Sequence, residues 1–424
     1  MKYIFYIFFC FFFVSCSNDF LDRNPLDKPS NEGFWNTEKD AIAAATGCYN
    51  GWFSMDEVLY FDCASDNAYS PFPWEGWTVH GSGYATPTDY GYSRFSYSNI
   101  TRCNNFLENI SRPKMDEKLR SRLTAEVRFL RVWDYFWKVV LYGDVPLVTD
   151  VLTIDESDRP RNPKSEVIEF MLNELSEIIP SLDIKYEGDN VGRITRGAAM
   201  TLKARILLFE KRYKECAEIC NEIFSLGYRL FDSYDGLFRI SNENNPEVIL
   251  DVQYLSSLYS NWFLGVLLPN SVGGWASINP LQSLVDSYEC VDGKTIDESP
   301  LFDKNEPYKN RDHRLEVTLL CPGDLYCGKY YNPIDKNDPN GDYYAPYGRS
   351  KTAYLVKKYV NNPDDYSDIW DTGMNAIVMR YAEVLLMYAE SKIELNDVDE
   401  SVYQVLNQIR QRAGLPEVDR AVYS

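Results

Sequence analysis

The chain has 424 residues, of which 45% are hydrophobic and 15% aromatic, and its formal net charge is -20 at pH 7. This length supplies enough apolar material for one large or two ordinary domains with a buried core. The acidic balance argues against nucleic acid as a partner, because binding to a phosphate backbone requires clustered cations.

The first residues are typical of an export signal. Lys2 precedes an almost unbroken apolar run over residues 4–14, which is too short for a comfortable membrane span. The run ends in Ser15-Cys16, and a small residue before a cysteine resembles the cleavage site of a bacterial lipoprotein. We therefore expect a signal peptide over residues 1–15 and a lipid on Cys16. Secretion without a lipid is the alternative.

Residues 16–36 are predicted to form an extended, acidic tether, and a helix is expected to begin near Thr37, which is followed by acidic residues typical of a first helical turn. Further helices are predicted over residues 96–110, 116–140 and 165–179. Beyond Phe231 the pattern changes to a strand-like run and then to a loop-rich half.

Residues 66–92 are dense in Pro, Gly, Tyr and Trp and lack a helical period, so we expect a long structured loop. In it, Trp74 and Trp77 are candidates for stacking on a sugar ring. Asp66 and Asn67 are candidates for hydrogen bonds to its hydroxyl groups. The alternative is that both tryptophans pack the loop onto the helices.

The most regular stretch, residues 195–226, reads as two amphipathic helices joined by a short turn. So short a turn requires an antiparallel pair. A related pattern occurs over residues 378–395 and 401–412. Because each hairpin buries only one side of its helices, we expect tetratricopeptide-like stacking of such hairpins. Two unrelated hairpins are the alternative.

Several segments resemble the SusD/RagB family of Bacteroidetes surface lipoproteins. They are Phe20-Leu21-Asp22 after the cysteine, AEVRFLRVWDYFWKVVLYGDVPLVT over residues 125–149, LPNSVGGW over residues 268–275 and NQIRQRAGLP over residues 407–416. The resemblance implies a mainly α fold of tetratricopeptide-like hairpins, an α-α superhelix, whose irregular second half carries short strands.

The resemblance also implies two domains. A SusD-like N-terminal helical domain is expected over residues 37–230, and a RagB/SusD second domain over residues 231–424. Family members normally continue well past the last of these segments, so the second domain is expected to be incomplete at its C-terminus, and a genuinely short variant is the alternative.

The same resemblance implies function. It predicts a lipid-anchored protein of the outer membrane, exposed at the cell surface, which captures an oligosaccharide or other nutrient and delivers it to a SusC-like TonB-dependent transporter. Neither a cofactor nor a catalytic residue is expected. Relatives that bind starch assemble an aromatic platform from loops of the second half, so Trp262 and Trp275 join the candidates. Trp275 lies in a family segment, which leaves a structural role as its alternative.

The sequence contains no G-x-S-x-G motif, Walker loop, dinucleotide fingerprint or HExxH motif. Zinc is not expected, because the chain has only His80 and His313 and no paired CxxC. Residues 335–342 look calcium-like, but in an EF-hand register Lys336 falls where a carboxylate is required. A disulfide between Cys321 and Cys327 is an open alternative in an oxidising compartment. A lipid-anchored glycoside hydrolase with a helical core and a helical scaffold without ligand are the rival functions.

Overall fold

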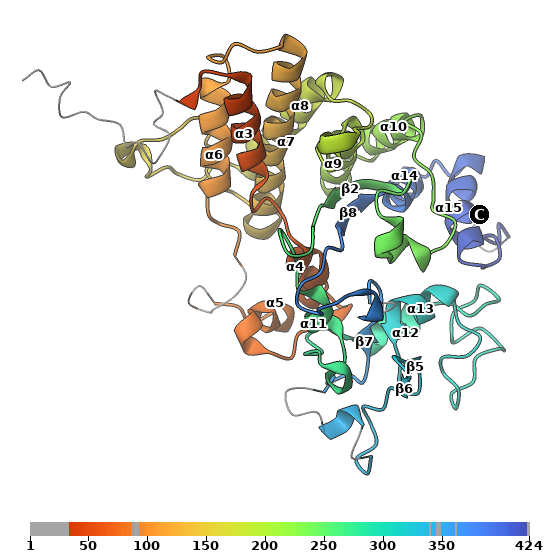
Figure 1. Ribbon diagram of the computed structural model, residues 1–424. Coiled ribbons are helices and arrows are strands. Elements are labelled where there is room, and N and C mark those ends of the chain that lie inside the picture. The colour runs from red at the N-terminus through yellow and green to blue at the C-terminus, as the bar shows by residue number, and fades with distance from the viewer. Residues whose placement is uncertain are drawn as a thin grey trace, which may run out of the picture.

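The computed structural model of the protein (Figure 1) describes residues 34–86, 88, 93–338, 341–344, 349–360 and 363–421. The predicted signal peptide, the predicted lipidation site Cys16 and most of the predicted tether lie outside the described residues. The helices are α3 (Glu38–Tyr49), α4 (Met55–Tyr60), α5 (Trp77–Ser82), α6 (Ser98–Asn109), α7 (Glu117–Tyr142), α8 (Lys164–Ile178), α9 (Arg196–Phe209), α10 (Tyr213–Phe224), α11 (Phe263–Leu267), α12 (Gln282–Ser287), α13 (His313–Thr318), α14 (Tyr381–Glu394) and α15 (Glu400–Arg412).

The strands are short and pair only in twos within the described residues. They are β1 (Ala68–Tyr69) with β3 (Asn279–Pro280), β2 (Val248–Val252) with β8 (Ala376–Arg380), β4 (Leu319–Leu320) with β7 (Leu355–Val356), and β5 (Leu325–Tyr326) with β6 (Lys329–Tyr330). All four pairs are antiparallel. The predicted mainly α fold with an irregular, strand-bearing second half is confirmed.

Helix α7 is the centre of the first half, where α3, α6 and α8 pack against it. The side chain of Asp116 caps its first turn by accepting a hydrogen bond from Leu119 N. Gly143, at φ 68°, ends it in a conformation that favours glycine. Its side chains from Leu123 to Val139 are largely buried, and Trp133 is among the largest side chains that are fully enclosed. The helix is therefore covered on most sides.

The predicted hairpins stack side by side. Helices α9 and α10 form the first, α14 and α15 form the second, and α14 packs on α10. Figure 1 shows the blue C-terminal helices beside the green ones. Cys216 and Cys220 lie fully buried on the inner face of α10, as small core residues do.

Strand β8 brings the end of the chain back to this stack, because it pairs with β2 and leads directly into α14. Glu247 lies beside β2 with its side chain fully buried. It accepts hydrogen bonds from Phe231 N, Arg380 and Arg412. Buried residues on both sides of the predicted boundary between residues 230 and 231 belong to one hydrophobic core. The division into two domains at this boundary stays a prediction.

The described part of the predicted loop, residues 66–86 and 88, contains short regular elements. It pairs with the second half through β1 and β3 and contains the six-residue helix α5. Residues 87 and 89–92 lie outside the described part. Across all the residues that the structure describes, no helix is long and apolar enough to cross a membrane.

Candidate functional site

Three tryptophans, two of them flanking helix α11 and the third from much later in the chain, form an exposed cluster in the second half. The ring centroids of Trp262 and Trp275 lie 6.1 Å apart at 74°, and those of Trp275 and Trp370 lie 4.7 Å apart at 50°. Their side chains remain 45%, 41% and 37% exposed, in the order Trp262, Trp275 and Trp370. We call Trp262, Trp275 and Trp370 the tryptophan cluster. It offers apolar ring faces at several inclinations on the surface of an acidic protein.

Helix α11 holds this cluster together. Trp262 precedes the helix directly, and Trp275 N donates to the carbonyl oxygen of Gly265 at 2.7 Å. Gly265 N in turn donates to the carbonyl oxygen of Ile369 at 3.1 Å, which places the neighbouring Trp370. The segment is fixed further by Asn261 and Thr372, whose backbone groups exchange two hydrogen bonds of 2.9 Å.

A carboxylate of the first half orients one of the rings. Trp262 Nε1 donates to Asp56 Oδ1 at 3.1 Å, and Asp56 lies in the first turn of α4. Burial raises the pKa of Asp56; the hydrogen bond from Trp262 opposes that effect, and the charge of Glu57 adds to it. The cluster is therefore tied to both halves of the chain.

A stacked pair of tyrosines lies beside the start of α4. Tyr254 and Tyr259 stack with centroids 5.4 Å apart at 11°, and Tyr259 remains exposed. Tyr254 is fixed because its hydroxyl accepts a hydrogen bond from Met55 N at 2.8 Å. Tyr259 also lines a cavity of about 370 Å³ together with Trp52 and Arg193.

Of the two tryptophans predicted in the first half, Trp74 is exposed and Trp77 is not. Trp74 is 70% exposed and stacks on Phe72 with centroids 4.9 Å apart. Trp77 is 5% exposed, stacks on Tyr60 at 5.7 Å and meets Phe61 edge-on at 5.2 Å. The prediction that Trp77 presents a face to a sugar is therefore wrong, and the packing alternative holds for it.

Helix α4 connects the Trp74 loop with the tryptophan cluster. Glu75, next to Trp74, accepts hydrogen bonds from Tyr60 Oη at 3.0 Å and Ser70 Oγ at 2.9 Å. Tyr60 lies one helical turn after Asp56, so the two residues lie on one face of α4. The helix thus contacts Trp262 through one residue and the Trp74 loop through the other.

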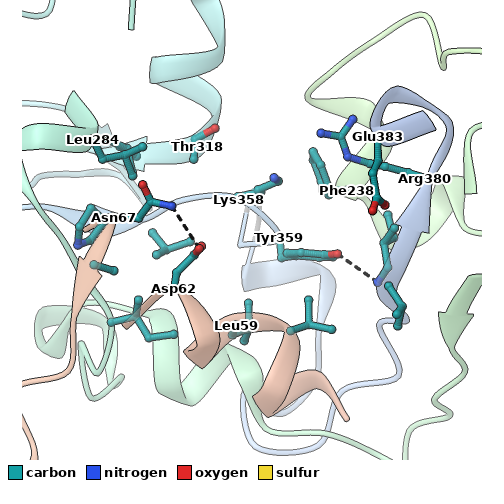
Figure 2. A pocket seen from close by; sticks show the side chains of 18 residues that line it. Leu59, Asp62, Asn67, Phe238, Leu284, Thr318, Lys358, Tyr359, Arg380 and Glu383 are labelled. Carbon is teal, nitrogen blue, oxygen red and sulfur yellow. Dashed lines mark hydrogen bonds between the residues drawn. The ribbon is translucent and has the colours of Figure 1, made fainter. Parts of the chain in front are cut away.

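Asp66 and Asn67 serve mainly to join the two halves. The carbonyl oxygen of Asp66 accepts from Ser283 Oγ at 2.7 Å, and that of Asn67 accepts from Leu281 N at 2.8 Å. The side-chain amide of Asn67 donates to Asp62 Oδ1 at 3.3 Å inside a separate cavity (Figure 2), whose lining includes neither Trp74 nor Trp77. The structure therefore does not bring Asn67 to the predicted sugar contact.

Among the described residues no group of three or more His, Cys, Asp or Glu side chains is arranged to hold a metal ion. Asp335 instead accepts from Asn337 N at 2.8 Å, and Asp338 accepts from Asn332 at 3.1 Å, as in an ordinary turn. Cys321 and Cys327 are both free thiols, the first buried and the second exposed, so the structure does not contain the disulfide that the sequence left open.

Comparison with known proteins decides the family. Residues 242–424 match the family model described as the SusD family, and residues 19–208 match the one described as starch-binding associating with outer membrane. The chain belongs to the SusD/RagB family. The prediction made from the sequence segments is confirmed.

Individual relatives span most of the chain. A SusD-like protein of Bacteroides ovatus is 25% identical over 440 residues, which cover 95% of this chain and 74% of that protein. A SusD-like carbohydrate binding protein from Bacteroides fragilis superposes with a TM-score of 0.81 at 26% identity, over 91% of this chain and 81% of that one. Surface glycan-binding protein A from Bacteroides thetaiotaomicron, in complex with laminarihexaose, has a TM-score of 0.69 at 20% identity, over 91% of this chain and 84% of that one. This last likeness shows the fold alone.

Proposed function

We propose that this SusD/RagB protein binds an oligosaccharide at the cell surface and that the tryptophan cluster of Trp262, Trp275 and Trp370 is its platform. The observation that carries the proposal is the convergence of three exposed indoles from three segments, two of them fixed to the backbone of one short helix. The relatives named for starch and carbohydrate binding support it.

The chemistry of the platform suits sugars. The axial C–H groups of a pyranose form an apolar face that stacks on an indole and leaves the hydroxyl groups in water. Three such contacts contribute about 4 kcal/mol, which corresponds to a dissociation constant of about 1 mM. Because the rings are inclined by 74° and 50°, a bent or helical glycan chain follows them better than a flat one.

Trp74 belongs to this proposal as a second contact. Its side chain is more exposed than that of any tryptophan of the cluster, and its stacking on Phe72 holds its ring in place. Through Glu75, Tyr60 and α4 its loop is connected to Asp56, which orients Trp262. A longer glycan would contact Trp74 in addition to the cluster.

Delivery to a transporter and the lipid anchor are further parts of the proposal. Association with the outer membrane is the description attached to the family model that matches residues 19–208. A lipid on Cys16 and a SusC-like TonB-dependent transporter as partner are inferred from the signal sequence and the family. Mass spectrometry of the mature N-terminus tests the lipid, and co-purification from detergent-solubilised outer membranes tests the transporter.

No catalytic role is assigned, since the relatives whose names state a function are named for carbohydrate or glycan binding. The rival glycoside hydrolase requires an acid and a second carboxylate at a fixed separation in a cleft, and release of a chromophore from aryl glycosides would reveal it. The rival scaffold without ligand would co-purify with a transporter and bind no glycan.

Isothermal titration calorimetry against a panel of soluble glycans tests the binding function. We expect one glycan class to bind the wild type and the triple variant Trp262→Ala, Trp275→Ala, Trp370→Ala to lose that binding. Tyr330→Ala is the matched control, because Tyr330 is an exposed aromatic residue of β6 outside the cluster. Binding by the triple variant equal to that of the wild type would remove the site from the proposal.

A further inference from the structure

A second cavity, separate from the tryptophan cluster, lies where the two halves of the chain meet. Its volume is about 230 Å³, and its walls come from the end of α4 and the turn after it, from Asn67, from the β4 and β7 region and from the start of α14. None of the three clustered tryptophans lines it. Figure 2 shows its labelled side chains converging from these segments.

Lys358 is the distinctive group of this cavity. Figure 2 shows its ammonium group directed toward the space between Thr318 and Phe238. Its Nζ lies 4.3 Å from the centroid of Phe238, and its backbone N–H donates to the carbonyl oxygen of Thr318 at 3.2 Å. Among the described residues no carboxylate lies within salt-bridge distance of Nζ, although the chain carries 63 acidic and 43 basic residues. A cation without an ion pair is therefore unexpected here.

Arg380 also lines the cavity, and Arg412 lies behind it, over the ring of Tyr234. Arg380 and Arg412 share a single carboxylate, that of Glu247. The pKa of the neighbouring Tyr234 is affected by these cations. Burial acts to raise the pKa of Tyr234, but the charges of Lys358 and Arg380, with hydrogen bonds from Thr318 and Lys358, lower it below its ordinary value.

Two acids, Glu383 and Asp62, also line the cavity. Glu383 is held by the guanidinium of Arg205, with one contact from Nη2 to Oε2 of 2.7 Å, so its charge is compensated. Asp62 stands on the opposite wall in Figure 2, where it accepts the amide hydrogen bond of Asn67 at 3.3 Å. The cavity thus has the ammonium group of Lys358 on one side, and the carboxylate of Asp62 with the amide of Asn67 on another.

We propose that this cavity binds a small hydroxylated carboxylate of the sugar-acid class, with the carboxylate on Lys358 and the hydroxyl groups at Asp62 and Asn67. A charge-assisted hydrogen bond to the ammonium group supplies much of the affinity. The hydroxyl groups of the ligand donate hydrogen bonds to Asp62. An anion without hydroxyl groups makes no such bonds, and the charge of Asp62 repels it. The volume lies below the roughly 300–1,000 Å³ of drug-sized pockets, so the occupant is of monosaccharide size.

Calorimetry and thermal shift with D-glucuronate, D-glucose and sulfate test the assignment on the full mature chain. We expect saturable binding of glucuronate with a raised Tm, and no binding of glucose or sulfate. Lys358→Met should weaken glucuronate at least about tenfold. Lys357→Met is the matched control, since Lys357 is the adjacent lysine and does not line the cavity; it should bind glucuronate as the wild type does.

Two further variants, Lys358→Gln and Asp62→Asn, complete the test. Lys358→Gln repeats the charge removal with a polar side chain, and circular dichroism with the Tm of the unliganded variants establishes that they fold. Asp62→Asn should weaken glucuronate and leave the Tm of the free protein nearly unchanged. Failure of glucuronate to bind the wild type, equal binding by both folded Lys358 variants, or sulfate binding as tight as glucuronate would each overturn the proposal. Glycan binding on the tryptophan cluster should survive in Lys358→Met, so the two proposals fail independently.

Discussion

The indole ring of Trp370 lies directly on the backbone of Gly265. A Cβ built at residue 265 would stand 2.0 Å from the nearest ring atom, so no larger side chain leaves the ring where it is. Because Gly265 also accepts the N–H of Trp275, one position of α11 sets the placement of two rings. The shape of the proposed platform therefore depends on a residue that contacts no ligand.

Gly265→Ala should displace Trp370 and weaken glycan binding about tenfold without removing any aromatic ring. The affinity is measured by calorimetry, and the folded state by circular dichroism. Gly47→Ala serves as the control, because Gly47 lies in α3 and a Cβ there meets nothing within 4 Å. If Gly265→Ala binds the glycan as tightly as the wild type, the position of Trp370 does not matter for binding.

The contact between Trp262 and Asp56 gives a second prediction. Asp56→Asn keeps an oxygen that accepts the hydrogen bond from Trp262 Nε1, and it removes a carboxylate whose pKa is raised by burial. A raised pKa in the folded state means that folding is stabilised at low pH and loses that stabilisation as pH rises through the folded pKa. At neutral pH we therefore expect Asp56→Asn to raise the free energy of unfolding, because the asparagine brings no charge into the buried position.

Asp56→Ala is the counterpart of that variant. It removes the acceptor as well as the charge, so the ring of Trp262 loses its hydrogen-bond partner and the glycan affinity should fall while that of Asp56→Asn is retained. Chemical denaturation measures the stability and calorimetry the affinity. Equal affinity in the two variants would show that the hydrogen bond does not orient the ring for binding.

The sequence predicted the helical stack because its determinants are local. The hairpin of α9 and α10 follows from a short turn between two amphipathic runs, and the end of α7 follows from Gly143. The helix of α3 begins after Thr37, whose side chain and that of Asp40 form a capping box. Each of these signals lies within a few residues of the feature that it specifies.

The site could be predicted only in part, because it depends on distant contacts. Nothing in the neighbourhood of Trp74 and Trp77 distinguishes them; Tyr60 and Phe61, from an earlier segment, bury the second. Trp370 was missed because it joins the cluster through the pairing of Asn261 with Thr372, across 111 residues. Its setting between Asp368 and Asp371, in an acidic and polar segment, was the one available signal.

Glu247 gives a prediction on stability. Its fully buried carboxylate holds Arg380 and Arg412, and it accepts Phe231 N at 2.8 Å. Glu247→Ala leaves two guanidinium groups without their carboxylate and should lower the free energy of unfolding by about 3–5 kcal/mol. Urea denaturation followed by circular dichroism measures the change.

The matched control for Glu247 is Glu306→Ala, which removes an exposed carboxylate paired with the exposed Lys309. Exposed pairs of this kind contribute about 0–1 kcal/mol, so this variant should unfold close to the wild type. A loss in Glu247→Ala no larger than that of the control would show that Glu247 does not hold the C-terminal helices on the stack.

The last prediction concerns pH and rests on Glu243. Its Oε1 accepts the N–H of Asn375 at 2.6 Å, and Asp251 Oδ2 accepts the side-chain amide of the same asparagine at 3.1 Å. Burial raises the pKa of Glu243 from 4.5 to about 7; the hydrogen bond from Asn375 opposes the shift and the charge of Asp251 adds to it. Between these two pH values the folded chain retains a proton that the unfolded chain has released, so stability should fall as pH rises across that interval.

Glu243→Gln mimics the protonated side chain and keeps the acceptor for Asn375 N, so its stability should not decline over the same interval. The difference in free energy of unfolding, variant minus wild type, should grow from pH 5 to pH 7 and then level off at about 1 kcal/mol, a value discounted because the side chain is partly exposed. Urea denaturation of both proteins at pH 5, 6, 7 and 8 measures it. The control is Glu218→Gln, at an exposed position of α10; its free energy of unfolding should change with pH as that of the wild type does. If the free energy of unfolding of Glu243→Gln also changes with pH as that of the wild type does, the carboxyl group of Glu243 does not titrate near neutral pH.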